Sequence, residues 1–398
     1  MTYGHSQGTE DRFELRGYAP IGMSKIWSLA GLEYWVLREW DKERVLPEKT
    51  LVLGNEAIAM GAIEAGCRFY FGYPITPQNE IPEYMARHLP EVRGTFIQAE
   101  SEIASINMLL GAAATGARAM TSSSSPGISL KQEGISYMCG SMIPGVIVNM
   151  SRSGPGLGGI SPSQGDYFQA TRGGGHGDYR TIVLAPSSVQ ENYDLTMKAF
   201  DLADKYRNPV VVLGDALLGQ MKEPLVKRKH RPKRFQNDWI LTGAKGRRPR
   251  FLKSLYLSEG ELTEHNWMLF KKYQKMRREV KFETVLLKGA KLVVVAFGSV
   301  ARILKTSVSM AREKGMKVGL FRPITLYPFP SAELEKISGS VKNFMAIELN
   351  TGQMLEDLKL AVGHTRSHVD FYGRPPGSIP SPDELFQQIK KIYSKRIG

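Results

Sequence analysis

Polar side chains that could bind or transform a ligand follow four apolar, strand-like runs of this 398-residue sequence. Residues 73–77 (YPITP) form a turn stiffened by two prolines, which presents Thr76. Residues 98–102 bring two carboxylates, residues 122–127 bring four serines and a glycine, and Arg152 follows a further apolar run. A carboxyl group exchanges protons, a guanidinium holds a carboxylate through paired hydrogen bonds, and glycine lets a ligand approach the backbone. These residue types suit acid–base chemistry and the binding of an anion.

Each of these residues also has a purely structural explanation. Thr76 can cap the next helix, Glu102 can interact with a helix dipole, and Arg152 can form a surface salt bridge. On position alone, the structural explanation is the more common one in all three cases. The serine-rich turn has no GxSxG motif and no evident His/Asp partner, which argues against a serine hydrolase.

The elements that must position these side chains lie in residues 49–220. Apolar runs such as RFYFGYP, PGVIVNM and NPVVVLG alternate there with amphipathic segments such as SVQENYDLTMKAFDLADKY. This alternation predicts an α/β fold with a parallel sheet covered on both faces. Ligands of such sheets bind at the carboxyl ends of the strands, which is where Thr76, Glu102 and Arg152 lie.

The rest of the chain divides into three segments. Residues 289–396 repeat the alternation and predict a second, smaller α/β domain, whereas residues 221–288 are charged and irregular and predict a connector. Residues 1–48 form an N-terminal extension. We expect a helix there to pack on the body of the protein through its tryptophans, which are Trp27, Trp35 and Trp40.

Positive charge is concentrated in one part of the predicted connector. The formal net charge is +14, and eleven Lys and Arg residues lie between Lys227 and Lys253 against a single acid, Asp238. Such a run can contact nucleic acid, anionic lipid or an acidic protein. No helix-turn-helix, zinc-finger or aromatic-rich RNA-binding pattern accompanies it, so a linker or a contact with a partner protein is favoured over nucleic acid.

The cysteine content limits the cofactors that the chain can hold. Cys67 and Cys139 form no CxxC motif, and two cysteines cannot ligate an iron–sulfur cluster, which takes about four. We expect two reduced, partly buried thiols and no metal site. There is no signal-peptide pattern and no apolar run of about 18 residues, so we expect a cytoplasmic protein without a membrane span.

Several longer motifs agree in order with one known family. The sequence resembles the alpha-type subunit of 2-oxoacid:ferredoxin oxidoreductases from about residue 48 to residue 395. The motifs that carry the resemblance are YPITP (73–77), QAESEIASIN (98–107), SSSPGISLKQEGISY (123–137), PGVIVNMSRSGPGLG (144–158), PSQGDY (162–167), GGGHGDYR (173–180), LAPSSVQE (184–191), FRPITLYPFP (321–330) and GQMLEDLK (352–359). The glycine-rich run through GGGHGDYR is most similar to the enzymes that act on 3-methyl-2-oxobutanoate, and the 2-oxoglutarate enzymes are the alternative.

The resemblance implies a division of labour between subunits. It makes residues 49–220 a domain that binds the pyrimidine ring of thiamine diphosphate, and residues 289–396 a transketolase C-terminal-like domain. The resemblance places the diphosphate and Mg²⁺ on a beta-type subunit, and the sequence agrees, since it has Gly214-Asp215-Ala216 where a diphosphate site needs a GDG motif. The iron–sulfur clusters belong to partner chains, and a gamma-type subunit and a ferredoxin-like delta subunit complete the assembly. The implied reaction converts a 2-oxoacid and coenzyme A to acyl-CoA and CO₂ and passes electrons to ferredoxin.

The resemblance also assigns roles to individual residues. Glu102 matches the catalytic glutamate that hydrogen-bonds the aminopyrimidine ring and promotes its imino tautomer. Thr76 and Arg152 match residues that contact the carboxylate and oxo group of the substrate. Further contacts with the cofactor are implied for Tyr73, Pro74, Ile75 and Ser125.

The sequence departs from the family at one position in the serine-rich turn. Ser125 stands where the family commonly has a glycine before Pro126-Gly127, which puts the fine substrate specificity in question. A non-catalytic paralogue that serves in assembly is a further alternative, and the presence of Glu102, Thr76 and Arg152 argues against it.

Overall fold

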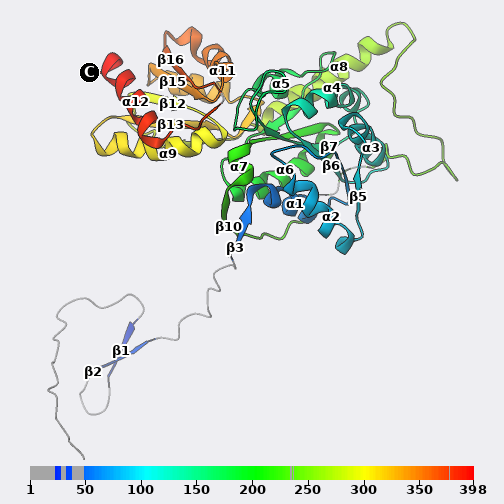
Figure 1. Ribbon diagram of the computed structural model, residues 1–398, viewed down its shortest axis with the longest axis horizontal. Coiled ribbons are helices and arrows are strands. Elements are labelled where there is room, and N and C mark those ends of the chain that lie inside the picture. The colour runs from blue at the N-terminus through cyan, green and yellow to red at the C-terminus, as the bar shows by residue number, and fades with distance from the viewer. Residues whose placement is uncertain (1–22, 28–32, 38–48, 234, 236, 376) are drawn as a thin grey trace, which may run out of the picture. The chain divides into compact units, whose positions relative to one another are not determined.

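The computed structural model describes residues 23–27, 33–37, 49–233, 235, 237–375 and 377–398, in two compact units, 1–48 and 49–398. In the first unit, β1 (Met23–Trp27) pairs antiparallel with β2 (Glu33–Leu37) (Figure 1). The predicted helix is therefore wrong over these residues, and Trp40 lies outside the described ones. Tryptophan, tyrosine, valine and isoleucine all favour strands, and this preference prevails here.

The larger sheet of the second unit has the strand order β14-β8-β9-β7-β6-β4-β5. Neighbouring strands from β8 to β5 are parallel, as predicted, and β14 is antiparallel to β8. The strands are β4 (Phe69–Gly72), β5 (Thr95–Gln98), β6 (Ala119–Ser123), β7 (Gly145–Ser151), β8 (Ile182–Leu184), β9 (Pro209–Asp215) and β14 (Thr325–Tyr327).

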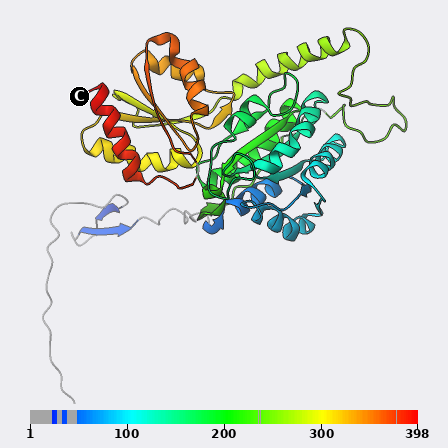
Figure 2. The same cartoon turned by 45° about the horizontal axis from the view of Figure 1, so that its top comes forward.

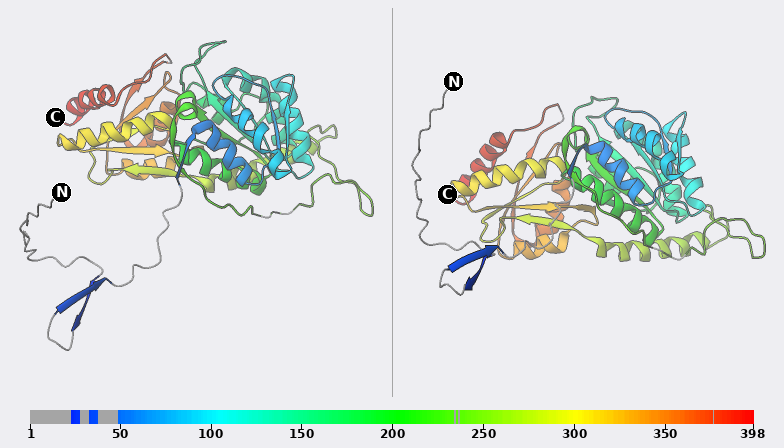
Figure 3. Two further views of the ribbon diagram at one scale, coloured as in Figure 1. Left: turned by 60° about the horizontal axis from the view of Figure 1, so that its bottom comes forward. Right: turned by 90° about the horizontal axis from the view of Figure 1, so that it is seen from below.

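Helices cover both faces of this sheet (Figures 2 and 3). They are α1 (Gly54–Glu64), α2 (Glu80–His88), α3 (Glu102–Ala114), α4 (Ser125–Gly140), α5 (Tyr167–Arg172), α6 (Val189–Tyr206) and α7 (Ala216–Gln220), with a 3₁₀ turn η1 (Pro90–Val92). Every residue of β6, β7 and β9 is buried. Two-sided burial explains why these strands read as continuous apolar runs.

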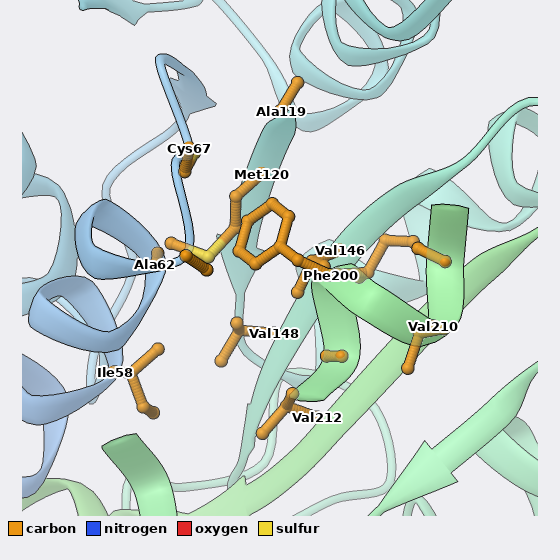
Figure 4. Packing of buried hydrophobic residues seen from close by; sticks show 14 of the residues in the cluster. Ile58, Ala62, Cys67, Ala119, Met120, Val146, Val148, Phe200, Val210 and Val212 are labelled. Atoms are coloured by element: carbon orange, nitrogen blue, oxygen red, sulfur yellow. The ribbon is translucent and has the colours of Figure 1, made fainter. Parts of the chain in front are cut away.

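The core of this domain lies between the sheet and helices α1 and α6. Ile58 and Ala62 of α1 and Phe200 of α6 face Met120, Val146 and Val148 of the central strands (Figure 4). Cys67 belongs to the same cluster, and both Cys67 and Cys139 are buried free thiols. Burial raises the pKa of each thiol to about 12, so neither is a reactive thiolate.

The apolar run TLVLG (50–54), which the same alternation predicts as a strand, does not join the parallel sheet. Instead, β3 (Lys49–Leu53) pairs antiparallel with β10 (Lys222–Val226) in a separate ribbon. Val52 is buried, whereas Lys49, Thr50 and Leu51 are exposed. A strand with one buried face suits such a ribbon better than a sheet that is covered on both sides.

The smaller sheet has the order β11-β13-β12-β15-β16, and all its neighbouring pairs are parallel except β11 with β13. Its strands are β11 (Phe282–Val285), β12 (Leu292–Val295), β13 (Val318–Pro323), β15 (Asn343–Glu348) and β16 (His368–Gly373). The accompanying helices are α9 (Gly298–Glu313), α10 (Ser331–Ser338), α11 (Gln353–Val362), α12 (Pro382–Arg396) and the 3₁₀ turn η3 (Gly363–Thr365).

The segment predicted as an irregular connector contains regular structure. Besides β10 and β11, it forms the long helix α8 (Glu261–Met276), which leads through η2 (Arg277–Glu279) back to the smaller sheet (Figure 2). The basic run before α8 lies partly against the larger domain, where Arg228 pairs with Asp194 and Leu241 donates a backbone hydrogen bond to Ala114. The high charge of this segment concealed α8, whose buried residues Leu269, Tyr273 and Met276 are interspersed with Lys and Glu.

The two domains of the second unit are joined by buried polar contacts. The guanidinium of Arg322 in β13 donates both terminal nitrogens to Glu191 of α6 at 2.9 and 2.7 Å, and its Nε to Glu283 of β11 at 2.7 Å. Asp215, at the end of β9, accepts a hydrogen bond from Ser299 of α9. These contacts fix the smaller domain against the larger one.

Candidate functional site

The carboxyl ends of β7, β6, β4 and β5 lie at one edge of the larger sheet. These strands are neighbours and parallel, with Ser123 opposite Asn149 and Gly72 opposite Gln98 in the register. Helices α3 and α4, which start just beyond β5 and β6, pack against each other and against these strands (Figure 1). The topology therefore gathers the four polar segments singled out in the sequence.

Glu102 is the first residue of α3 and is only 7% exposed. Ser101 caps the helix by accepting a hydrogen bond from the Ala104 amide at 3.1 Å, which leaves the Glu102 carboxylate free for another role. The carboxylate faces Gly127 in the first turn of α4. A Cβ atom at Gly127 would lie 2.6 Å from Glu102 Oε1 and 2.1 Å from Ser123 Oγ, so no larger residue fits beside the carboxylate.

The start of α4 is tied to β7 by its serines. Ser124 Oγ donates to the Met150 carbonyl at 2.8 Å. Ser125 Oγ accepts from the Arg152 amide at 2.9 Å and donates to Asp166 Oδ2 at 2.6 Å. The serine that replaces the family's glycine thus bonds to the backbone of the predicted substrate-binding arginine.

Arg152 is 8% exposed and lies just beyond β7. Its Nη1 donates to the Thr76 carbonyl at 3.0 Å, and its Nη2 donates to the Leu157 carbonyl at 3.3 Å. A guanidinium has five N–H groups, so these bonds leave three donors, including a buried Nε that has no protein partner. Among the described residues, Arg152 forms no salt bridge, so the structural explanation suggested by its position does not hold. Its remaining N–H groups are free to bind an acceptor from outside the chain.

The turn after β4 brings Thr76 next to Arg152 but leaves its side chain exposed, as it does for Tyr73 and Pro74; Ile75 is half-buried. Asn79, and not Thr76, precedes α2 at the N-cap position. The capping explanation of Thr76 is therefore wrong.

Asp166 is a functional candidate that sequence reasoning missed. Its Oδ2 accepts from Ser125 Oγ and from Asn149 Nδ2 at 2.8 Å, so it links α4 and β7. Its neighbour Gln164 donates to the Phe297 carbonyl at 2.9 Å and accepts from the Leu349 amide at 3.0 Å, both in the smaller domain. The PSQGDY motif thus connects the strand ends to the second domain. The sequence shows Asp166 only as a charged residue in the PSQGDY motif, and no periodicity there indicates which residues it contacts.

Residues 60–252 match the family model described as pyruvate flavodoxin/ferredoxin oxidoreductase, thiamine diphosphate-binding, and residues 290–385 match pyruvate:ferredoxin oxidoreductase core domain II. The ketoisovalerate oxidoreductase subunit VorB of Methanothermobacter thermautotrophicus is 48% identical over 347 residues, which are 86% of this chain and 97% of that protein. The chain belongs to the 2-oxoacid:ferredoxin oxidoreductase family. The resemblance found in the sequence is thereby confirmed.

The chain is also similar to proteins that are named as 2-oxoglutarate enzymes. The 2-oxoglutarate synthase subunit KorA of Archaeoglobus fulgidus is 38% identical over 354 residues, 86% of this chain and 99% of that one. A solved 2-oxoglutarate:ferredoxin oxidoreductase from Magnetococcus marinus, with 2-oxoglutarate, coenzyme A and succinyl-CoA bound, superposes with a TM-score of 0.81 at 27% identity. This superposition covers 87% of this chain and 65% of that one.

The strand ends of this oxidoreductase subunit carry buried polar groups that suit a bound ligand such as thiamine diphosphate. Gly127 lets the start of α4 lie directly against the Glu102 side chain, and no described residue donates a hydrogen bond to the Glu102 carboxylate. Ser123 Oγ, Asn149 Oδ1 and Arg152 Nε are also buried there without protein partners. Buried polar atoms normally have partners, so these atoms indicate a ligand at this edge.

The carboxyl group at the end of β9 is bonded within the chain. Asp215 is buried, caps α7 through a 3.0 Å bond from the Leu218 amide and accepts from Ser299. Burial raises the pKa of this carboxyl, against the hydrogen bonds it accepts. Among the described residues no group of His, Cys, Asp and Glu side chains could hold a metal ion, and no helix is long and apolar enough to cross a membrane.

Proposed function

We propose that this chain is the pyrimidine-binding subunit of a thiamine-diphosphate-dependent 3-methyl-2-oxobutanoate:ferredoxin oxidoreductase. The observation that carries the proposal is the Glu102 carboxylate, which is buried at the sheet edge and receives no hydrogen bond from the described residues. A carboxylate in this setting can hydrogen-bond a ring nitrogen of the cofactor and favour its imino form.

The choice of substrate is supported by identity and by the residues near Arg152. Identity to the ketoisovalerate enzyme subunit is 48%, against 38% for the 2-oxoglutarate synthase subunit. The loop 153–161, which is hydrogen-bonded to Arg152 through Leu157, contains no lysine or arginine and carries exposed Leu157 and Ile160. 2-Oxoglutarate has a second carboxylate that would require a further cation, whereas an isopropyl group suits apolar neighbours.

The geometry supports a site that is completed by another chain. Tyr73 and Thr76 are exposed, and apolar side chains of the adjoining helices, Ile103, Leu130 and Tyr137, are 39–50% exposed. Exposed apolar groups around a set of unpartnered polar atoms indicate an interface. We assign this interface to a beta-type subunit that carries the diphosphate and Mg²⁺. The iron–sulfur clusters lie on partner subunits, which include a gamma-type subunit and a ferredoxin-like delta subunit.

In the assembled enzyme the cofactor supplies the electron sink that makes decarboxylation of a 2-oxoacid possible. Glu102 would hydrogen-bond a nitrogen of the pyrimidine ring and assist proton transfer there. Because its carboxylate is buried, water is excluded from this contact. Arg152 binds the substrate carboxylate with the N–H groups that Thr76 and Leu157 leave free, and Thr76 offers a hydroxyl to the oxo group. Coenzyme A takes the acyl group, and ferredoxin takes the electrons.

The test is viologen reduction by the complex co-purified through this chain. The assay compares 3-methyl-2-oxobutanoate, 2-oxoglutarate, pyruvate and an aryl 2-oxoacid, each with coenzyme A, with and without the beta-type partner. We expect activity that requires the partner and is highest with 3-methyl-2-oxobutanoate. A preference for 2-oxoglutarate would overturn the substrate assignment, and inactivity with every acid despite bound cofactor and intact clusters would overturn the catalytic role.

A further inference from the structure

Lys131 is fully buried in the face of α4 that packs against α3. It lies between Gly127 and Gly134, and this spacing places all three residues on one side of the helix. A Cβ atom at Gly134 would lie 2.6 Å from the side chain of Ile106 in α3, and one at Gly127 would meet Glu102. The two glycines therefore bring α4 close to α3, with the lysine in the contact between them.

The ammonium of Lys131 is directed at the first turn of α3. It donates to Thr121 Oγ1 of β6 at 3.1 Å, to the backbone carbonyl of Glu102 at 3.4 Å and to Ser105 Oγ. Ser105 Oγ itself donates to the Glu102 carbonyl at 2.9 Å. Lys131 thus joins α4 and β6 to the residue that begins α3.

Packing alone does not account for a lysine at this position. An ammonium in an apolar interior loses its hydration, and replacing such a charge with an apolar side chain of similar volume is often neutral or stabilising. Burial lowers the pKa of Lys131 to about 7, while the nearby Glu102 carboxylate opposes that shift. A methionine would fill the same space without the cost of burying a charge, so the amino group has a function beyond filling it.

We propose that Lys131 is a positioning residue that fixes the first turn of α3 and thereby orients the Glu102 carboxylate toward the cofactor ring. The proposal rests on the function assigned to Glu102 above. The backbone of Glu102 has its carbonyl held by Lys131, and its side chain leaves the helix at that same residue. A displacement of about 1 Å at such a point is enough to cost about a hundredfold in rate.

The experiment follows a single proton in the assembled complex. Deuterium exchange at C2 of the thiazolium ring of bound thiamine diphosphate is measured by NMR after acid quenching, without 2-oxoacid or coenzyme A. Lys131→Met should bind the cofactor but slow this exchange by about tenfold or more. In steady-state assays kcat should fall while KM for the 2-oxoacid stays near the wild-type value, because Arg152 and Thr76 are untouched.

The matched control is Lys272→Met. Lys272 is a second desolvated lysine, with its pKa lowered to about 8 by burial, and its amino group also donates to a backbone carbonyl, that of Arg207. It lies on α8, and its hydrogen bond goes to Arg207 and not to a residue of α3. Its substitution should leave the C2 exchange unchanged, and equal slowing in both variants would overturn the proposal.

A second variant decides the question if Lys131→Met fails to fold. Ser105→Ala removes one acceptor of Lys131 at a buried helical position that alanine tolerates, and it should slow the exchange by about threefold. Wild-type exchange in Ser105→Ala, or in folded Lys131→Met, would refute the role of Lys131. Failure of the proposed function would look different, because the wild-type complex would then not accelerate the exchange at all.

Discussion

At the scale of single residues, the structure separates groups that hold the site together from groups that are free to react. Ser101, Ser124 and Ser125 satisfy backbone amides and carbonyls around the strand ends. Glu102 and the Nε of Arg152 are buried at the same edge without comparable partners. Buried polar groups that remain unpaired cost stability, so their presence points to a ligand that pairs with them.

Substitution of Glu102 tests the carboxylate directly. Glu102→Gln keeps the volume and the helix but removes the group that exchanges a proton, so turnover should fall by about a hundredfold. Glu100→Gln, at an exposed position two residues earlier, is the control and should keep wild-type turnover. The complex is assayed by 2-oxoacid-dependent viologen reduction, and near-wild-type turnover of Glu102→Gln would remove Glu102 from the mechanism.

Substitution of Arg152 tests the contact with the substrate carboxylate. Arg152→Ala removes the remaining donors, so KM for the 2-oxoacid should rise by about tenfold or more while KM for coenzyme A changes little. Arg172→Ala, whose arginine is half-exposed and paired with Asp357, serves as the control. Equal increases in the two KM values would mean that Arg152 acts on the fold and not on the carboxylate.

The buried lysine predicts a particular pH dependence of stability. Its pKa is about 7 in the folded chain, lowered mainly by burial, and about 10.4 in an unfolded one. Between these values the unfolded state binds more protons, so the free energy of unfolding rises with pH. Denaturant titrations should therefore show that the free energy of unfolding of the wild type, minus that of Lys131→Met, rises by about 1.5 kcal/mol from pH 7 to about 8.5. A constant difference would contradict the lowered pKa.

At the scale of elements, the approach of α4 to α3 forms the site, and glycine makes that approach possible. Gly127→Ala places a methyl group against Ser123 Oγ and Glu102 Oε1, so α4 must shift or Glu102 must turn away. We expect a loss of stability of about 1–3 kcal/mol and a marked loss of cofactor binding. Thermal unfolding and titration with thiamine diphosphate measure the two effects.

Gly111 of α3 offers the matched control for Gly127. A Cβ atom there meets nothing within 4 Å, and the residue is exposed in a helix interior. Gly111→Ala should therefore stabilise the chain by about 0.5–1 kcal/mol and leave cofactor binding unchanged. Cofactor binding by Gly127→Ala at the wild-type level would show that the close approach of Gly127 to Glu102 is not needed for binding.

The elements that sequence reasoning predicted well are those whose burial is uniform. β6, β7 and β9 are buried on both faces, so their apolar runs could be recognised without knowledge of their neighbours. The β3–β10 ribbon and α8 were misjudged because their character depends on pairing or packing between distant residues, whereas for β1 and β2 the local strand preference of the side chains was overlooked. The positions of Thr76, Glu102 and Arg152 followed from the strand-end rule, whereas Asp166 and Lys131 depend on contacts that only the fold reveals.

At the scale of the whole molecule, residues 49–398 form one unit whose two domains share an apolar cluster and buried polar contacts. Gln164 spans from the site-bearing domain to Phe297 and Leu349, and Asp215 meets Ser299. β14, from the sequence of the smaller domain, completes the edge of the larger sheet. The smaller domain is therefore part of the support of the site, since the loop that carries Gln164 also carries Asp166.

Arg322 provides the strongest test of this coupling. It is 1% exposed and bridges Glu191 of the larger domain and Glu283 of the smaller sheet. Arg322→Ala leaves two carboxylates facing each other across a cavity, so the free energy of unfolding should fall by about 3 kcal/mol. Arg302→Ala breaks the more exposed pair with Glu223 and should cost less than about 1 kcal/mol.

Denaturant unfolding of the two variants, followed by circular dichroism, should show two transitions in Arg322→Ala and one in Arg302→Ala. A single transition with equal losses in both would mean that the domains are held together by their apolar contacts and that the buried arginine adds nothing to the coupling.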